Sequence, residues 1–320
     1  MKNYFKIYVS LFSIILLVLW RGGLHMLKNK DLKKLTQGQD KIENCLSEQF
    51  FNNDVSEWSN LSHIITEYPI KLVPCNELSE CDLFEKGIKK PFAYSPQCVV
   101  DSIYSLLEKV DNIFDKYDIP YMINSGTQLG ATRHGGLIPW DDDADIMIRN
   151  GTDEKRFLES TKEFIEQGMD VYALIVKKVR GYELVFYQIC HRNGRIRTST
   201  SVPYPALDVF TIKETESGLM EYATKHAREV FPDDSFNKKA WNSRVRVQFG
   251  HLNLLGFSPE YETEYLNKLY GKNWDTTAVT NPLDHETLVV MNKKSVTMNE
   301  KMFEHAKCSS ILNPLRTKQY

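Results

Sequence analysis

The chain has no surplus of positive charge, since its 40 lysines and arginines are balanced by 42 aspartates and glutamates, for a formal net charge of -2. Proteins that bind nucleic acid hold the phosphate backbone with an excess of lysine and arginine. The composition therefore argues against a nucleic acid partner, although a local basic cluster can still hold a small anionic substrate. Repeats and low-complexity tracts are also lacking, and 42% of the 320 residues are hydrophobic. We expect one large or two modest folded domains.

The six cysteines include no C-x-x-C pair, the close spacing that would indicate a strong zinc site. A zinc site formed by Cys75, Cys81 and Cys98 therefore stays one alternative among others. The cysteines also fit lumenal disulfides or buried thiols, and the short loop between Cys75 and Cys81 favours a bridge there. Two sequons, at Asn60 and Asn150, are usable only in the secretory lumen.

The apolar run near the N-terminus, residues 7–20, is shorter than a bilayer requires. As a helix it covers about 21 Å, against a hydrocarbon core of about 30 Å. Tyr4 and Phe5 extend the run if the Lys6 side chain reaches the membrane surface. No A-x-A-like cleavage site follows Trp20. We predict an uncleaved signal anchor at residues 4–20, with a cleaved signal peptide as the alternative.

Composition divides the chain into three predicted regions. Residues 1–25 are a short cytoplasmic tail and the anchor, residues 26–90 a polar stem and proline-containing lead-in, and residues 91–320 the folded domain. This arrangement predicts a single-pass type II protein of the Golgi or ER membrane, with the domain in the lumen. Lysines on both sides of the apolar run compete under the positive-inside rule, so charge alone does not decide the orientation.

Helical and extended patterns alternate along the third region. We expect helices at 99–114, 127–133, 153–167 and 259–269, and strands at 121–124, 143–148, 171–179, 184–190 and 207–210. This mixture predicts an α/β or α+β domain built on a mixed sheet.

Two aspartates of the D-x-D pattern fall within one predicted strand. Side chains two residues apart share a face of a strand, so Asp143 and Asp145 point the same way, while Ala144, Ile146 and Ile148 point into a core. Two carboxylates on one face can hold one hard cation, such as Mg²⁺ or Mn²⁺. The sequence therefore predicts a metal site at this strand.

Other aspartates receive different interpretations. Asp208 lies in the apolar segment 207–210, where an unpaired charge is costly, so we expect it to be a third metal ligand or a general base. Asp141 shares the parity of the D-x-D pair and is a candidate to support the metal, although Pro139 disfavours a central strand there. Asp142 fits a solvated loop, turned away from the site.

A phosphate-binding turn is predicted upstream of the aspartates. Gly126 and Thr127 open a short helix, and a helix N-terminus offers free N–H groups and a positive dipole end. Arg133 and His134 close the same helix and form a candidate basic pair for an anionic donor.

The ordered run from Gly126 to Ile146, G-T-x-L-G-A-x-R-H-x-G-x-I-P-W-D-D-D-x-D-I, resembles the LicD family, which includes the fukutin and fukutin-related proteins. The segments D-V-F at 208–210 and Y-L-x-x-L-Y-G-x-x-W at 265–274 also resemble family features. The resemblance covers roughly residues 91–282. Residues 1–90 do not take part in it.

The resemblance implies a nucleotidyltransferase-type fold, a mixed sheet flanked by helices, over residues 91–320. It implies transfer of a phospho-alcohol, such as phosphocholine or ribitol phosphate, from a CDP-linked donor to a glycan hydroxyl. Asp143 and Asp145 then match the D-x-D metal ligands and Asp208 the third acidic residue. Gly126 and Thr127 match the phosphate-side turn, and Arg133 and His134 the basic pair.

Two alternatives stay open at this point. A Golgi glycosyltransferase also combines a D-x-D pattern, a signal anchor and a metal-bound nucleotide diphosphate. A non-catalytic lumenal protein could keep the fold to bind a glycan or to organise a complex, although the complete acidic set argues against it.

Overall fold

The computed structural model describes residues 71–74, 92, 94–95, 97–178, 181–196, 202–279 and 294–308. All of them belong to one compact unit, Ser56–Tyr320. The predicted anchor at 4–20, the predicted Cys75–Cys81 bridge and the Asn60 sequon lie outside the described residues. Across the ranges that are described, no helix combines the length and the hydropathy needed to cross a bilayer.

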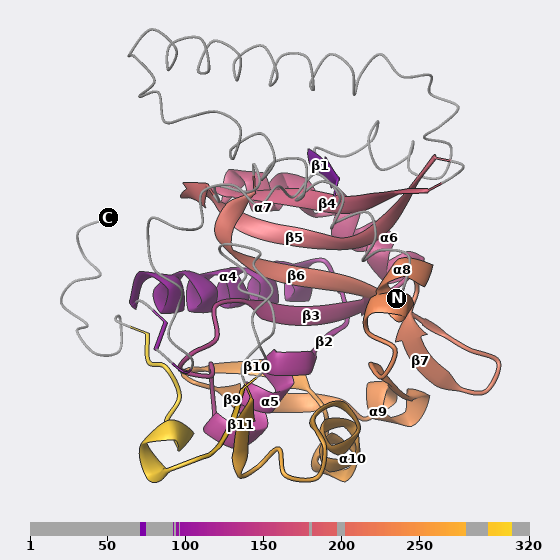
Figure 1. The fold of residues 1–320 in the computed structure, drawn as a ribbon. Coiled ribbons are helices and arrows are strands. Elements are labelled where there is room, and N and C mark those ends of the chain that lie inside the picture. Colours follow the sequence, from indigo (N-terminus) through magenta and orange to yellow (C-terminus); the bar gives the residue numbers. More distant parts are fainter. Residues whose placement is uncertain are drawn as a thin grey trace, which may run out of the picture. The chain divides into compact units, whose positions relative to one another are not determined.

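The described ranges contain both helices and strands (Figure 1). The helices are α4 (Gln97–Lys116), α5 (Ser125–His134), α6 (Thr152–Glu159), α7 (Thr161–Glu166), α8 (Lys225–Val230), α9 (Lys238–Asn242), α10 (Pro259–Tyr270) and the 3-10 helix η3 (Glu300–Phe303). The strands are β1 (Lys71–Pro74), β2 (Tyr121–Ile123), β3 (Ala144–Arg149), β4 (Met169–Lys178), β5 (Gly181–Ile196), β6 (Pro203–Glu214), β7 (Leu219–Tyr222), β8 (Ser235–Asn237), β9 (Val245–Phe249), β10 (Leu252–Gly256), β11 (Thr277–Val279) and β12 (Ser295–Thr297).

The main sheet has the strand order β1-β4-β5-β6-β3-β2, and β7 and β8 extend it from β6 (Figure 1). Strand β3 pairs in parallel with β6, and β1 in parallel with β4, while the other pairs of this sheet are antiparallel. The predicted mixed α/β sheet is therefore confirmed. Strand β1 lies in the part of the sequence assigned to the lead-in, and the predicted division into 26–90 and 91–320 stays a prediction.

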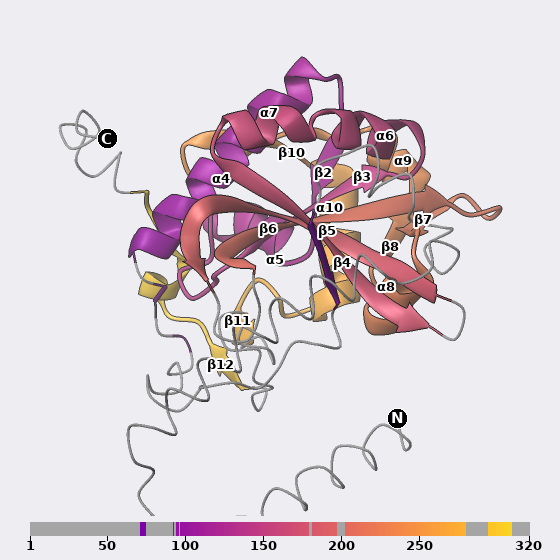
Figure 2. The ribbon, with the colours of Figure 1, turned by 90° about the horizontal axis from the view of Figure 1, so that it is seen from above.

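Helices cover both faces of this sheet, and Figure 2 shows α6 and α7 on one side and α8 on the other. Ala144, Ile146 and Ile148 of β3 are each at most 1% exposed, as their alternation with Asp145 predicts. The α6 side of the sheet is reached by Tyr187 of β5, whose ring lies 5.1 Å from that of Phe157. The opposite core includes Met147, which shares the face of Asp145, and packs against α9 and α10 residues. The acidic site thus lies on the face opposite α6.

Helix α4 follows its apolar spacing. Its buried residues are Val99, Val100, Ile103, Tyr104, Leu106, Leu107, Val110, Ile113 and Phe114. The helix stops at Lys116, before Pro120, as expected. The observed α10 begins at Pro259 and is followed by Gly271, also as expected.

The expected single helix at 153–167 is wrong, because the structure divides it into α6 and α7 at Ser160. Ser160 Oγ donates to the carbonyl of Phe157 at 2.7 Å, and Thr161 Oγ1 donates to that of Leu158 at 2.7 Å. Hydroxyls that bind nearby carbonyls compete with the helical ladder. The apolar periodicity across 153–167 gives no indication of these hydrogen bonds, so it predicts one continuous helix.

The expected strands at 184–190 and 207–210 are only the apolar centres of β5 and β6, which extend to 181–196 and 203–214. At its C-terminal end β6 adds the exposed residues Lys213 and Glu214, which pair with β7. Backbone pairing can extend a strand beyond its buried residues, so hydrophobicity underestimates its length.

The hydroxyl of Tyr104 ties α4 to two distant segments. It donates to the carbonyl of Ala306 at 2.9 Å and accepts from the N–H of Leu137 at 3.1 Å, and the residue is 1% exposed. Close packing around this hydroxyl requires glycine at Gly136, where a Cβ would lie 2.7 Å from it. The bond to Leu137 helps to fix the loop that leads to the aspartates.

We predict that Tyr104→Phe lowers the free energy of unfolding by about 1–3 kcal/mol, because it leaves a buried N–H and a carbonyl without their partner. Chemical denaturation followed by circular dichroism measures this loss. Tyr94→Phe is the control, since Tyr94 is 59% exposed and also donates to a carbonyl, and we expect a change below about 0.5 kcal/mol. Equal losses in the two variants would contradict the role given to Tyr104.

Candidate functional site

Three carboxylates, one from β3, one from β6 and one from the residue just before β3, meet on one face of the sheet. The parallel register of β3 and β6 sets Asp145 beside Asp208, and Asp143 precedes Asp145 by two residues. One oxygen from each of these three side chains lies within 4.8 Å of the others, and all three residues are half-buried. The structure therefore brings together the three acidic residues that the sequence singled out.

A glutamine that sequence reasoning did not identify lies beside these three carboxylates and contacts one of them. Gln188 of β5 is in register with Asp208, is 4% exposed, and donates from Nε2 to Asp208 Oδ1 at 2.7 Å. The bond fixes one oxygen of Asp208 and so orients the other. Gln188 lies between Tyr187 and Ile189 in an apolar strand. That signal, a polar residue inside an apolar strand, is the one that identified Asp208, and it applies equally to Gln188.

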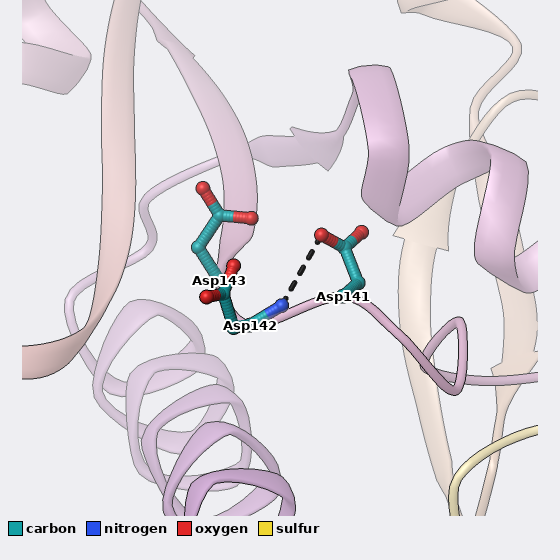
Figure 3. Close-up of side chains that lie close together, drawn as sticks. All are labelled: Asp141, Asp142 and Asp143. Atoms are coloured by element: carbon teal, nitrogen blue, oxygen red, sulfur yellow. Dashed lines mark hydrogen bonds between the residues drawn. The ribbon is translucent and has the colours of Figure 1, made fainter. Parts of the chain in front are cut away.

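The loop before β3 carries two more carboxylates. Asp141, Asp142 and Asp143 each offer an oxygen within 4.8 Å of the others, and Asp141 Oδ1 accepts from the N–H of Asp142 at 3.2 Å (Figure 3). Ser95 holds this loop from the other side, because its Oγ donates to the carbonyl of Asp141. Asp141 thus adjoins the three-carboxylate group through Asp143.

The expectation of a solvated Asp142 is wrong. Asp142 is 6% exposed, and its Oδ2 accepts from the hydroxyl of Tyr204 at 2.9 Å. Tyr204 belongs to β6, a strand distant in sequence, so a local turn pattern could not reveal this partner.

Helix α5 begins at Ser125, two residues earlier than expected, which places Gly126 and Thr127 in its first turn. Thr127 Oγ1 accepts from the N–H of Asp145 at 2.7 Å. A Cβ on Gly126 would lie 3.1 Å from Asp141 Oδ2, so that carboxylate rests against the helix start. Among the described residues no acceptor bonds the N–H groups of Gly126 and Thr127. The first turn of α5 is thus built into the acidic site, and the Thr127 side chain holds β3.

Arg133 and His134 lie at the other end of α5, in its last turn. The Arg133 guanidinium donates to the carbonyl of Trp274 at 2.7 Å, to that of Thr277 at 3.1 Å, and to His134 Nε2 at 2.9 Å. The two side chains therefore tie α5 to the segment after α10. Burial lowers the pKa of Arg133 to about 10, and the negative charge of Asp141 acts in the opposite direction. Arg133 therefore interacts electrostatically with one carboxylate of the acidic group.

The imidazole of His134 is buried, with 6% of the residue exposed. Burial, followed by the nearby charge of Arg133, lowers its pKa from 6.5 to about 4. Its ring packs edge-on against Trp140 with centroids 5.6 Å apart. Burial therefore disfavours a positive charge on His134, and the role of Arg133 and His134 as a basic pair for a donor stays a prediction.

Tyr270, the last residue of α10, is a further group near the acidic cluster that sequence reasoning did not assign. Although 38% of the residue is exposed, burial around its hydroxyl raises its pKa well above 10, and Asp145, Asp234 and Asp141 raise it further.

The acidic cluster at adjacent strands and the helix start beside it lie within a segment that matches a nucleotidyltransferase family model. Residues 118–256 match the family model described as LicD/FKTN/FKRP, nucleotidyltransferase domain. That range contains β2 to β10, the four aspartates at 141–145, and Asp208. The resemblance to the LicD family is therefore confirmed for this part of the chain.

Individual relatives match over segments of different length. An uncharacterized protein of Rickettsia prowazekii (strain Madrid E) is 29% identical over 178 residues, 56% of this chain and 57% of that protein. Lipopolysaccharide cholinephosphotransferase LicD of Haemophilus influenzae is 36% identical over 55 residues, 17% of this chain and 20% of that protein. Ribitol 5-phosphate transferase FKRP of Homo sapiens is 33% identical over 55 residues, 17% of this chain and 11% of that protein.

The chain spans about half the length of the Rickettsia proteins that it matches, and less of the two named transferases. The shared segments support a transferase relationship. They do not by themselves assign a donor, an acceptor or a metal.

We predict a pH dependence of stability that originates at His134. Its folded-state pKa of about 4 lies below the 6.5 of an unfolded histidine, so the unfolded chain binds more protons between these values. Stability therefore falls as the pH is lowered from about 6.5 toward 4, and this residue accounts for about 2 kcal/mol at pH 5.

Urea denaturation at pH 7 and at pH 5 measures this contribution. His134→Gln retains an acceptor for Arg133 but does not titrate, and we expect it to lose about 2 kcal/mol less than the wild type between these pH values. His251→Gln, at an exposed position, is the control and should follow the wild type. Identical pH profiles for all three proteins would show that His134 is not buried as described.

Proposed function

We propose that this domain transfers a phospho-alcohol from a CDP-linked donor to a hydroxyl group of a glycan. The observation that carries the proposal is the convergence of Asp143, Asp145 and Asp208 beside the first turn of α5. This convergence lies inside the segment that matches the LicD/FKTN/FKRP domain. Phosphocholine and ribitol phosphate are the transferred groups we favour, in line with the names of the two transferase relatives.

The donor set fits a hard divalent cation, Mg²⁺ or Mn²⁺. All the candidate ligands are carboxylate oxygens, which such cations prefer, and three of them converge within 4.8 Å. Gln188 fixes Asp208, and Thr127 fixes the backbone of Asp145, so the geometry of two ligands is held by neighbours. A cation bound there would neutralise negative charge on the donor diphosphate.

We assign the other steps of the reaction to residues of the chain. The N–H groups of Gly126 and Thr127 are oriented to hold a phosphate oxygen at the positive end of α5. The acceptor hydroxyl attacks the β-phosphorus of the donor, the bond from that phosphorus to the bridging oxygen breaks, and CMP leaves. We assign the hydroxyl proton to Asp141, the carboxylate that adjoins the three-residue group through Asp143.

We further propose that the domain works in the lumen of the Golgi or ER, held by an anchor at residues 4–20. The Asn150 sequon supports this placement, because Asn150 is exposed in the turn between β3 and α6. If it is glycosylated, endoglycosidase treatment shifts the expressed protein on a gel, and Asn150→Gln reduces the shift. A wild-type protein that does not shift in secretory cells would argue against a lumenal domain.

The acidic residues give a direct test of the function. We predict that Asp143→Asn and Asp145→Asn each lower transfer by at least about 100-fold, because each removes a charge aimed at the reacting phosphates. The assay follows label from the β-phosphate of CDP-choline or CDP-ribitol in the presence of Mg²⁺ or Mn²⁺. Circular dichroism and thermal denaturation confirm that both variants are folded.

Asp233→Asn is the control, because Asp233 is an exposed aspartate with a similar change in charge. Label that reaches the acceptor supports phosphotransfer, whereas release of labelled CDP with transfer of the unlabelled alcohol indicates a glycosyltransferase-type reaction. Full activity in Asp143→Asn or Asp145→Asn would overturn the metal assignment.

A further inference from the structure

A buried carboxylate lies next to the start of α5, outside the group of acidic residues already described. Asp234, between α8 and β8, is 7% exposed. It accepts hydrogen bonds from Ser125 Oγ at 2.9 Å, from Tyr265 at 2.7 Å, and from the hydroxyl of Tyr222. No basic side chain pairs with it in the part of the chain that the structure describes. Hydroxyl donors alone therefore stabilise its charge, which is a costly arrangement for a residue with only a packing role.

The three hydroxyls are converging donors. Burial raises the pKa of Tyr222 and of Tyr265 well above 10, and the charge of Asp234 raises both further, so both hydroxyls stay protonated. Asn124 adds to the group, because its Nδ2 donates to Tyr222 at 3.1 Å and to Ser125 Oγ at 3.2 Å. We call these five residues, Asn124, Ser125, Tyr222, Asp234 and Tyr265, the Asp234 network.

The network acts on a residue with an unfavourable backbone conformation. Ser125 has a φ of 46°, in the left-handed region that a residue with a Cβ rarely adopts. Its side chain donates to Asp234 and its N–H donates to the hydroxyl of Tyr265 at 3.1 Å, so the network holds Ser125 from two directions. Strained residues persist where the surroundings determine them, and they cluster at functional sites.

The conformation of Ser125 sets the direction of the residues that follow it. Gly126 lies against Asp141, and Thr127 Oγ1 accepts from the N–H of Asp145. A relaxed Ser125 would turn this first turn of α5 relative to β3. The two N–H groups assigned to the donor phosphate would then point elsewhere.

We propose that Asp234 is a positioning residue, which holds Ser125 in its left-handed conformation so that the first turn of α5 presents its N–H groups to the donor phosphate. This inference rests on the proposed function for its consequence in catalysis. The geometry at Ser125 is testable without any substrate.

The experiment uses the full chain and asks whether glycine at position 125 rescues the loss of Asp234. We expect Asp234→Asn to lower kcat for transfer about tenfold or more and to speed amide hydrogen exchange by a similar factor at residues 125 and 128, whose N–H groups bond Tyr265 and the carbonyl of Asn124. Glycine adopts positive φ at little cost, so Ser125→Gly introduced into Asp234→Asn should recover several-fold of both losses.

Two controls separate positioning from general stability. Asp118 also has positive φ, at 50°, in an exposed turn after α4, so Asp118→Gly relieves the same kind of strain elsewhere. We expect it not to rescue Asp234→Asn. Asp233→Asn removes the neighbouring exposed charge and should keep the wild-type kcat and exchange rates.

Several results would overturn the inference. They are an unchanged kcat and exchange rate in Asp234→Asn, rescue by Asp118→Gly as large as that by Ser125→Gly, or no rescue by either. If Asp234→Asn does not fold, Tyr265→Phe takes its place, since it removes the hydroxyl that links Ser125 to Asp234. A wild-type protein that transfers no label but shows the expected exchange pattern rejects the phosphotransferase proposal and retains the assignment of Asp234 to the α5 turn.

Discussion

The parallel pairing of β3 with β6 is the constraint on which the rest of the site depends. It places Asp145 beside Asp208 although 63 positions, the difference of their residue numbers, separate them in the chain. Like charges at this distance repel unless a cation or hydrogen-bond donors compensate them. Gln188 from β5, the N–H groups of α5 and the loop at Asp141 are arranged around this charge. The need to compensate this negative charge thus explains why β5, α5 and the loop at Asp141 lie beside the acidic cluster.

Two levels of support surround the carboxylates. The inner level is made of hydrogen bonds to the acidic residues or their backbone, from Gln188 to Asp208 and between Thr127 and Asp145. The outer level is the Asp234 network, which fixes the start of α5 and with it Thr127. Sites that bind charged groups need such support, because small displacements of a ligand or donor weaken electrostatic stabilisation. The family match, residues 118–256, covers the inner level and every member of the Asp234 network except Tyr265.

Local patterns predicted the parts of the site that lie within one element. The alternation of Asp143 and Asp145 with Ala144 and Ile146 gave the correct face of β3, because side-chain direction in a strand follows from its period of two. Partners that come from other elements could not be predicted in this way. Tyr204, which holds Asp142, and Asp234, which holds Ser125, have no local signal in the sequence, since each acts on a residue far away in the chain.

The sequence by itself determined the mixed α/β composition, the principal apolar segments and the identity of the three clustered aspartates, because these depend on periodicity and on the cost of a charge in an apolar strand. The tertiary structure alone decided the strand order, the burial of Asp142 and His134, and the hydrogen bonding of Asp234 to the start of α5. Those features arise when segments distant in the chain pack together. Their free energies come from desolvation and hydrogen bonding between elements, which no local pattern of residues records.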